Sequence, residues 1–182
     1  MTTESVTAPG APVRDRTDLL VERWHAQNES VDVDTKSLAI RLRRANQHVG
    51  RALREDLARL EMETWEAEVL LAVRRHGGRS VHAGELVRDS QVTSGAITNR
   101  IARLERRGWA RRDVDPEDRR QVLVSLTDEG RRAADRVIAS RAGAEERLFA
   151  VLDRSTRARM AADLRALLVG IEGPADEEED LP

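Results

Sequence analysis

The chain has 182 residues and a formal net charge of −2 at pH 7, and 35% of its residues are charged. Cysteine is absent, which excludes a disulfide scaffold, a thiolate metal site, a cysteine nucleophile and a thiol redox switch. No apolar run is long enough to span a membrane, and the four histidines do not pair at metal-ligand spacing. We therefore expect one domain with some additional helices, without a membrane span, a metal site or a bound cofactor.

The N-terminal third predicts an arm followed by two helices. Residues 1–15 are low in apolar content and lack the apolar core of a secretory leader, so we expect a disordered arm on a cytoplasmic protein. A short apolar stripe predicts a helix near residues 16–28. After a loop that ends in an N-cap at residues 32–35, apolar residues at intervals of three and four predict a long amphipathic helix over roughly 37–60.

In the middle of the chain the hydrophobic period changes from that of helices to that of strands. The last helix of this region is capped by Thr93 and is followed by Gly108, at the position that favours a left-handed residue. Two strands follow, joined by a turn at residues 115–118. The expected elements are helices over 64–76, 81–88 and 94–107 and strands over 109–114 and 121–126. A β-hairpin directly after a helix-turn-helix makes a winged helix, so the predicted fold class is mainly α with a small β-wing.

The C-terminal part predicts two more helices and a tail. Thr127 caps a helix that runs through the 130s and 140s, and a final helix covers about 155–170. The apolar stripes of 37–60 and 130–170 exceed what one small winged domain covers, which predicts an obligate homodimer. Six acids and no base fall within residues 172–180, so residues 173–182 form an acidic, solvated tail.

The charge distribution indicates double-stranded DNA as a partner. Residues 100–120 hold eight arginines and five acids, a local net charge of +3. A helix-turn-helix places its second helix in the major groove, where small and polar side chains approach the base edges while the helix N-terminus favours phosphate. The predicted DNA-binding residues of this helix and its cap are Thr93, Ser94, Gly95, Ala96, Thr98, Asn99, Arg100 and Arg103.

The wing supplies a second predicted contact. Arg119 and Arg120 lie at the hairpin tip, and a flexible arginine at such a tip commonly enters the narrow minor groove. In the alternative, one of them pairs with Asp115 or Asp118 and braces the hairpin. Both can hold at once, with one arginine bracing the hairpin and its neighbour contacting DNA.

Residues 86–130 closely resemble the MarR family of winged helix-turn-helix transcriptional regulators. The specific motifs are the wing, Asp115-Pro116-Glu117-Asp118-Arg119-Arg120, and the segment after it, Leu126-Thr127-Asp128-Glu129-Gly130. Residues 93–101 are similar to the family's recognition helix, and the resemblance extends more weakly over residues 16–172. It implies an obligate dimer whose terminal helices interlock and whose two recognition helices meet successive major grooves of a pseudo-palindrome.

A narrower resemblance concerns a ligand, because the helix at 16–28 is typical of a urate-responsive subgroup with a trans-aconitate-binding member. In that subgroup a tryptophan, an acid and two arginines form an anion pocket. The matching positions are Trp24, Glu68, Arg100 and Arg112, with glutamate where the subgroup usually has aspartate. Each also has a simpler interpretation: Trp24 as a core anchor, Glu68 as a surface charge or ion-pair partner, Arg100 as a phosphate contact and Arg112 as a structural or DNA-contacting arginine.

The combined hypothesis is a homodimeric, ligand-released repressor. Its expected parts are an arm (1–15), N-terminal helices for dimerisation and the ligand pocket (16–62), the winged helix-turn-helix (63–128), C-terminal dimerisation helices (129–172) and the tail (173–182). The effector is expected to be a small anion, such as a urate-like purine or a polycarboxylate. The alternatives are a ligand-independent architectural DNA-binding protein and a winged-helix module that binds protein. An enzyme is not expected, because the sequence shows no phosphate loop, nucleophile elbow or metal constellation.

Overall fold

The computed structural model describes residues 14–28, 30, 32–90 and 92–174. The expected arm and acidic tail therefore lie outside the described residues, except at 14–15 and 173–174. Residues 1–50 form one unit of the chain and residues 51–182 form a second. Helix α2, Val33–Arg59, contributes residues to both.

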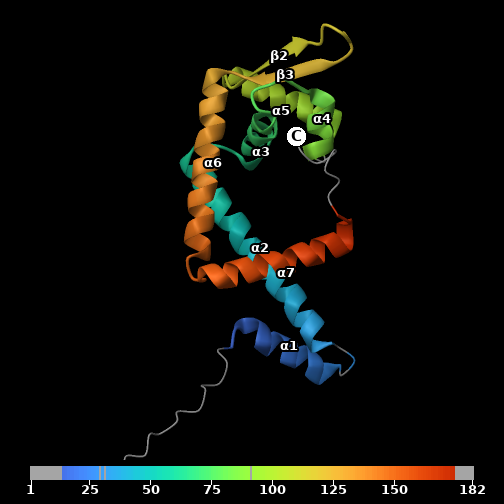
Figure 1. The fold of residues 1–182 in the computed structure, drawn as a ribbon, viewed down its shortest axis with the longest axis vertical. Helices are drawn as coiled ribbons and strands as arrows, with labels where there is room; N and C mark the ends of the chain where they lie inside the picture. Colours follow the sequence, from blue (N-terminus) through green and yellow to red (C-terminus); the bar gives the residue numbers. More distant parts are fainter. Residues whose placement is uncertain (1–13, 29, 31, 91, 175–182) are drawn as a thin grey trace, which may run out of the picture. The chain divides into compact units, whose positions relative to one another are not determined.

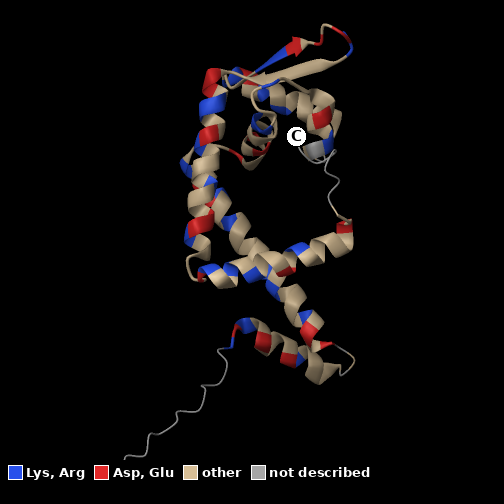
Figure 2. Cartoon of the chain, viewed as in Figure 1, with Lys and Arg blue, Asp and Glu red and all other residues tan. Residues whose placement is uncertain are grey.

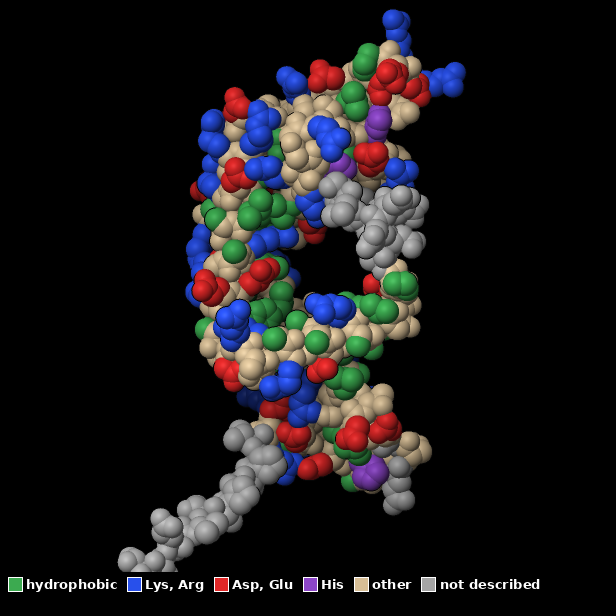
Figure 3. All heavy atoms as spheres, viewed as in Figure 1, with side chains coloured by type: hydrophobic (Ala, Val, Ile, Leu, Met, Phe, Trp, Pro, Cys, Tyr) green, Lys and Arg blue, Asp and Glu red, His purple; other side chains and the backbone are tan. Residues whose placement is uncertain are grey.

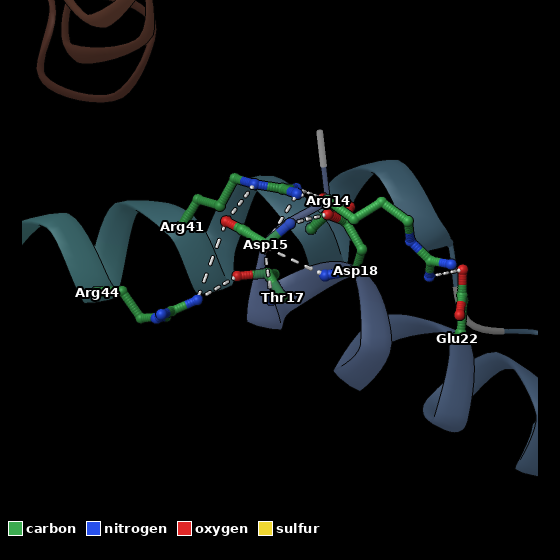
Figure 4. Close-up of polar contacts among 8 residues, drawn as sticks. Arg14, Asp15, Thr17, Asp18, Glu22, Arg41 and Arg44 are labelled. Atoms are coloured by element: carbon green, nitrogen blue, oxygen red, sulfur yellow. Dashed lines mark hydrogen bonds and ion pairs between the residues drawn. The ribbon is translucent and has the colours of Figure 1, made fainter. Parts of the chain in front are cut away.

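In the first unit, polar side chains fasten α1, Arg16–Gln27, to the N-terminal half of α2 (Figure 4). Asp15 caps α1 by accepting the N–H groups of Thr17 and Asp18. Arg41 of α2 lies 2.7 Å from a carboxylate oxygen of Asp18, and Arg44 donates to Thr17 at 2.8 Å. A helix was expected here at 16–28, and these contacts explain how it is held against its neighbour.

Helix α2 begins at Val33 rather than near residue 37. Asp32 accounts for this difference: its carboxylate accepts the N–H of Asp34 at 3.1 Å, and its carbonyl accepts that of Lys36 at 3.0 Å. The predicted loop at 32–35 is thus the first turn of the helix, because Asp32 satisfies the free N–H groups of that turn.

The second unit contains the helix-turn-helix, a three-stranded sheet and three further helices besides the end of α2 (Figure 1). Its elements are α3 Thr64–Arg75, β1 Val81–His82, α4 Ala83–Ser90, α5 Ser94–Arg106, β2 Ala110–Val114, β3 Val122–Leu126, α6 Asp128–Phe149 and α7 Arg154–Glu172. The predicted fold class, mainly helical with a small β-wing, is confirmed.

The sheet is antiparallel with strand order β1-β3-β2. In the hairpin, Ala110 lies opposite Leu126 and Val114 opposite Val122. The short strand β1 was not predicted, since a helix was expected from residue 81. Instead Val81 pairs with Val124, and α4 begins only at Ala83. A two-residue strand that pairs with a distant partner leaves no local period to detect.

The core of this unit lies between α3, α5, α6 and β3. Its fully buried side chains include the apolar positions predicted for α3 and α5, and β1, β3, α4 and α6 add others: Val69, Leu70, Val73, Val81, Leu86, Ile97, Ile101, Leu104, Val124 and Val137. Burial of the inner face of α5 fixes which of its side chains remain available to solvent.

One close backbone contact joins the start of α6 to the start of the wing. Thr127 caps α6 by accepting the N–H of Gly130, donates its hydroxyl to the carbonyl of Gly108 at 2.6 Å, and bonds through its N–H to the carbonyl of Trp109 at 3.1 Å. A Cβ atom on Gly130 would lie 1.8 Å from that Trp109 oxygen. Only glycine permits this approach, which explains the glycine in the motif at 126–130.

A buried carboxylate joins the end of α2 to α6. Asp56 is 6% exposed, lies 2.6 Å from Arg147 and 3.4 Å from the Ser140 hydroxyl, and also pairs with Arg59. The hydrogen bond from Arg147 holds the pKa of Asp56 below its usual value. Because a buried charge is costly without a partner, this pair fixes the two helices to each other.

The Gly130 contact is testable by adding a single methyl group. We expect Gly130→Ala to lower the free energy of unfolding by about 3 kcal/mol or more, because the backbone atoms that it meets cannot move independently. Thermal and urea denaturation measure the change. The matched control is Gly84→Ala in α4, where a Cβ has no neighbour within 4 Å, and it should leave stability unchanged or raise it slightly. Equal stability of the two variants would contradict the proposed role of Gly130.

Candidate nucleic-acid interface

Helix α5 presents a polar face to solvent because its apolar face is buried. Ile97, Ile101 and Leu104 are at most 1% exposed, which confirms the predicted inner face. Thr93 caps the helix by accepting the N–H of Ala96 at 3.2 Å, as predicted. Of the other predicted contact residues, Ser94, Gly95, Thr98, Asn99 and Arg103 are exposed, and Ala96 and Arg100 are partly exposed.

The polar groups of this face differ in how far they are already engaged. The Thr98 hydroxyl donates to the carbonyl of Ser94 at 2.9 Å. Among the described residues, the Asn99 side chain forms no hydrogen bond within the chain, so both its donor and its acceptor remain available. An amide of this kind can form two hydrogen bonds with the major-groove edge of adenine.

Three arginines of α5 and its C-cap face three glutamates of α3 and its N-cap. Arg103 lies 2.9 Å from Glu63, whose carboxylate also accepts the Trp65 indole N–H at 2.9 Å. The guanidinium of Arg103 lies 4.4 Å from the centroid of the Trp65 ring. Cation–π contact and ion pairing together hold this side chain against α3, so Arg103 is less free to contact phosphate than the sequence indicates.

The C-terminal end of α5 is held most firmly. Arg107 donates to both carboxylate oxygens of Glu66, at 3.1 and 2.9 Å, and to the carbonyl of Glu61 at 3.2 Å. Its guanidinium also lies 3.7 Å from the centroid of the Trp109 ring. Glu66 is 4% exposed, and a buried carboxylate that receives a guanidinium fixes the position of both helices. A hollow of about 370 Å³ lies beside these contacts, and it is lined by Glu61, Glu63, Glu66, Arg103, Arg106 and Arg107.

The wing ends in two arginines that are not engaged. Arg119 and Arg120 are exposed, and within the described residues neither guanidinium forms an ion pair. The proposed bracing pairs with Asp115 or Asp118 are therefore not formed in this structure. Figure 2 marks basic residues at the turn of the wing, and Figure 3 shows basic side chains projecting outward there, as a minor-groove contact would require.

The base of the wing is braced by a histidine instead. His82 Nε2 of β1 lies 2.7 Å from Asp115 Oδ2, at the point where the hairpin leaves β2. The other oxygen of Asp115 accepts the N–H groups of Glu117 and Asp118 at 2.8 and 3.3 Å. The carboxylate thus organises the turn that precedes the two free arginines.

Two of the four predicted ligand-binding residues come together. Arg100 Nη1 lies 3.9 Å from Glu68 Oε2, and the Arg100 guanidinium lies 5.9 Å from the centroid of the Trp65 ring. Nη1 is buried and forms no hydrogen bond within the described residues, which is unusual for a buried donor. Glu68 is therefore an ion-pair partner that leaves part of the binding capacity of Arg100 unused.

The other two have different surroundings. Arg112 lies 2.7 Å from Glu105 and also donates its backbone N–H to that carboxylate at 3.1 Å. Glu105 is five residues beyond Arg100, or about 140° around the helix, so the structure does not bring Arg112 to Glu68. Trp24, in the first unit, is 47% exposed and has the Lys36 ammonium 5.4 Å from its ring centroid. The ligand-binding roles of Arg112 and Trp24 stay predictions.

Several residues that shape this surface were not identified from the sequence. Trp65, Glu66, Arg107 and His82 each act through a partner on another element, and the spacing of residues along the chain does not reveal such pairs. A local signal existed for Glu66 alone, because it accepts the backbone N–H of Glu63 at 3.0 Å in a capping box and such boxes have a recognisable four-residue spacing.

Comparisons with known proteins cover both the winged helix and the longer chain. A model of the MarR family matches residues 60–121. The HTH-type transcriptional regulator PecS of Dickeya dadantii is 27% identical over 154 residues, which are 84% of this chain and 90% of that protein. The multiple antibiotic resistance protein MarR of Salmonella typhimurium is 35% identical over 85 residues, which are 47% of this chain and 58% of that protein.

Solved structures agree with these relatives. Wild-type MarR of Escherichia coli is similar with a TM-score of 0.62 and 27% identity, over 72% of this chain and 96% of that one. A mutant of the same protein, complexed with operator DNA, is similar with a TM-score of 0.61 and 27% identity, over 72% of this chain and 93% of that one. In the part of the chain that the structure describes, no helix combines the length and the apolar character needed to cross a bilayer. Residues 60–121 thus match the MarR family model, and over most of its length the chain is similar to transcriptional regulators of that kind.

Proposed function

We propose that the protein is a sequence-specific DNA-binding transcriptional regulator, acting as a homodimeric repressor that a small anion releases from a pseudo-palindromic operator. The observation that carries the DNA-binding part is the pairing of a free polar face on α5 with a wing whose Arg119 and Arg120 are unengaged. The first of these suits the major groove, and the second suits the minor groove. A similar protein, a mutant MarR of Escherichia coli, is complexed with operator DNA in a solved structure, which supports DNA binding by this chain.

Base reading is assigned to Asn99 and Thr98, and backbone or minor-groove contact to Arg119 and Arg120. Thr93, Ser94, Gly95 and Ala96 surround the N-terminus of α5, where N–H groups favour phosphate. Arg100 and Arg103 are given a smaller share in DNA binding, because Glu68 and Glu63 already offset their charge.

DNA binding and dimerisation are assigned to different parts of the chain. Residues 63–128 bind DNA, while 16–62 and 129–172 supply the dimer interface. No residue of α7 is buried in the single chain, although its apolar side chains form a stripe. Their exposed fractions run from 39% to 71%, and the members are Met160, Leu164, Leu167, Leu168, Val169 and Ile171. An apolar surface of this kind needs a partner, and a second copy of the chain is the proposed one.

The proposed effector binds Arg100. The buried Nη1 atom and the loose contact with Glu68 leave room for an anion to replace the glutamate as partner of the guanidinium. Because Arg100 lies on α5, a ligand that separates it from Glu68 changes how this helix is held on α3. The anion site at Arg100 and the DNA-binding face of α5 are then linked, because the anion binds one arrangement of the helix more tightly than the other. A urate-like purine or a polycarboxylate remains the proposed class.

The proposed DNA-binding roles can be distinguished, because loss of a base contact lowers discrimination between sequences, whereas loss of a backbone contact lowers affinity for every duplex. Asn99→Ala should lower discrimination between the operator and unrelated duplex by about 1–3 kcal/mol.

Arg119→Ala should weaken binding to all sequences. It should also reduce, by roughly one, the slope of the logarithm of the binding constant against the logarithm of the salt concentration. Fluorescence anisotropy at several salt concentrations measures both, with Arg136→Ala on α6 as the matched control. Equal loss on every duplex would remove Asn99 from base reading. Unchanged binding by an Arg119→Ala, Arg120→Ala double variant would favour a protein-binding module.

The dimer is tested by placing a charge on the stripe of α7. Leu164→Glu should convert the dimer to monomers in sedimentation equilibrium, because the carboxylate would be desolvated in the interface. Ala162→Glu adds the same charge about 160° around the helix and should leave the dimer intact. Dimers of equal stability in both variants would exclude this face of α7 from the interface.

The ligand response is tested on duplex DNA from the region upstream of the gene. Urate or trans-aconitate should release the wild-type protein. Glu68→Gln should bind the anion more tightly in calorimetry, since a competing carboxylate is gone, yet release DNA less. Arg112→Ala tests the predicted ligand-binding role of Arg112. It should weaken the ligand response more than it lowers DNA affinity, and an unchanged ligand response would remove Arg112 from the site. Tight DNA binding that neither anion affects would favour the ligand-independent architectural protein.

A further inference from the structure

The wing is connected to the body of the domain by a histidine that lies between carboxylates. His82 follows Val81 in the short strand β1 and lies opposite Leu123 of β3. Its Nε2 atom reaches Asp115 at 2.7 Å, and its Nδ1 atom lies 3.8 Å from Glu85 at the start of α4. The ring therefore bridges the helix-turn-helix and the hairpin.

Asp115 connects His82 to the turn at the tip of the wing. One of its oxygens meets His82, and the other accepts the N–H groups of Glu117 and Asp118. Its own N–H donates to the carbonyl of Gln121 at 3.1 Å across the hairpin. Asp115 thus fixes the turn that carries the two unengaged arginines, through its side chain on one edge and its backbone N–H across the hairpin.

The charged groups around the ring all favour its protonated form. Strand β3 contributes Val, Leu, Val, Ser and Leu and no charge, while α4 contributes Glu85 and the turn contributes Asp115 and Asp118. The hydrogen bond with Asp115 raises the pKa of His82 above its ordinary value, and the charge of Glu85 adds to this rise. The same bond lowers the pKa of Asp115. The pKa of Asp118 is lowered mainly by the backbone N–H of Arg120, and the charge of His82 adds to this effect.

We propose that His82 is a positioning residue for the wing, whose protonation ties the wing turn to β1 and so directs Arg119 and Arg120 toward DNA. This inference rests on the proposed DNA-binding function. The folded pKa lies above that of the unfolded chain, so the tie is complete below about pH 6.5 and weakens as pH rises through the folded value. DNA affinity should fall in the same direction, because a loose wing must be ordered on binding.

The test is the DNA dissociation constant as a function of pH at constant ionic strength. Between about pH 6 and pH 8.5, wild-type affinity should fall roughly fivefold, because a charge-assisted hydrogen bond is about twice as strong as a neutral one. His82→Gln retains an N–H donor without a titrating charge, so its profile should be nearly flat and its affinity should match wild type at high pH. His76→Gln, in the same unit and without a carboxylate partner among the described residues, should retain the wild-type profile.

A second variant separates positioning from direct contact between the imidazolium and phosphate. Asp115→Asn retains an acceptor for the turn but removes the charge that His82 meets, so the midpoint of the affinity profile should move to lower pH. An unmoved midpoint, or a wild-type profile in His82→Gln, would overturn the inference. If the protein binds no duplex, the proposed function fails. The contact between His82 and Asp115 is then still testable, because NMR can follow the titration of the His82 ring. A His82 midpoint that Asp115→Asn leaves unchanged would then overturn the tie as well.

Discussion

The contact between Gly130 and the backbone of Trp109 is the constraint on which the rest of this molecule depends. Trp109 follows the recognition helix directly, its ring receives Arg107 from the end of that helix, and its carbonyl receives the start of α6. The recognition helix, the wing and the long C-terminal helix therefore meet at one peptide group. A displacement of α6 cannot be absorbed there by a flexible side chain, because backbone meets backbone. A rearrangement that moves the start of α6 would therefore reach the DNA-binding surface through this junction.

The charges of the domain divide into those that build the interface and those left for DNA. The local excess of arginine at 100–120 was interpreted as a DNA-binding surface, yet Arg100, Arg103 and Arg107 all face glutamates of α3. Arg112 is likewise paired, with Glu105. Ion pairs between helices position the recognition helix at the expense of its own positive charge. Among the eight arginines of this stretch, those without an ion pair in the described residues are Arg106, Arg119 and Arg120, and two of these three lie at the tip of the wing. The proposed link at the base of the wing therefore bears on DNA affinity.

How far the sequence predicted this structure depended on the range of the interaction. Local signals were reliable: Thr93 and Thr127 cap the helices expected of them, and Ile97, Ile101 and Leu104 form the buried face of α5. The motif of the wing predicted a hairpin at the correct residues. Contacts between distant residues could not be predicted, because His82 and Asp115 are 33 positions apart and Glu66 and Arg107 are 41 apart. The family resemblance did place one distant pair together, because Glu68 and Arg100 are in contact. It did not do so for Arg112, which pairs with Glu105.

The three α3–α5 pairs differ in strength, and the difference bears on regulation. Arg107 Nη1 contacts both oxygens of the buried Glu66 carboxylate, Arg103 and Glu63 form a single exposed pair, and Arg100 and Glu68 are in contact only at 3.9 Å. The recognition helix is therefore fastened at its C-terminal end and held loosely toward the end that approaches the bases. Under the proposed function, an anion would compete at the weaker pair and leave the stronger one in place. Core packing of Ile97 also holds the base-reading end, so such a ligand would shift the orientation of the helix without detaching it.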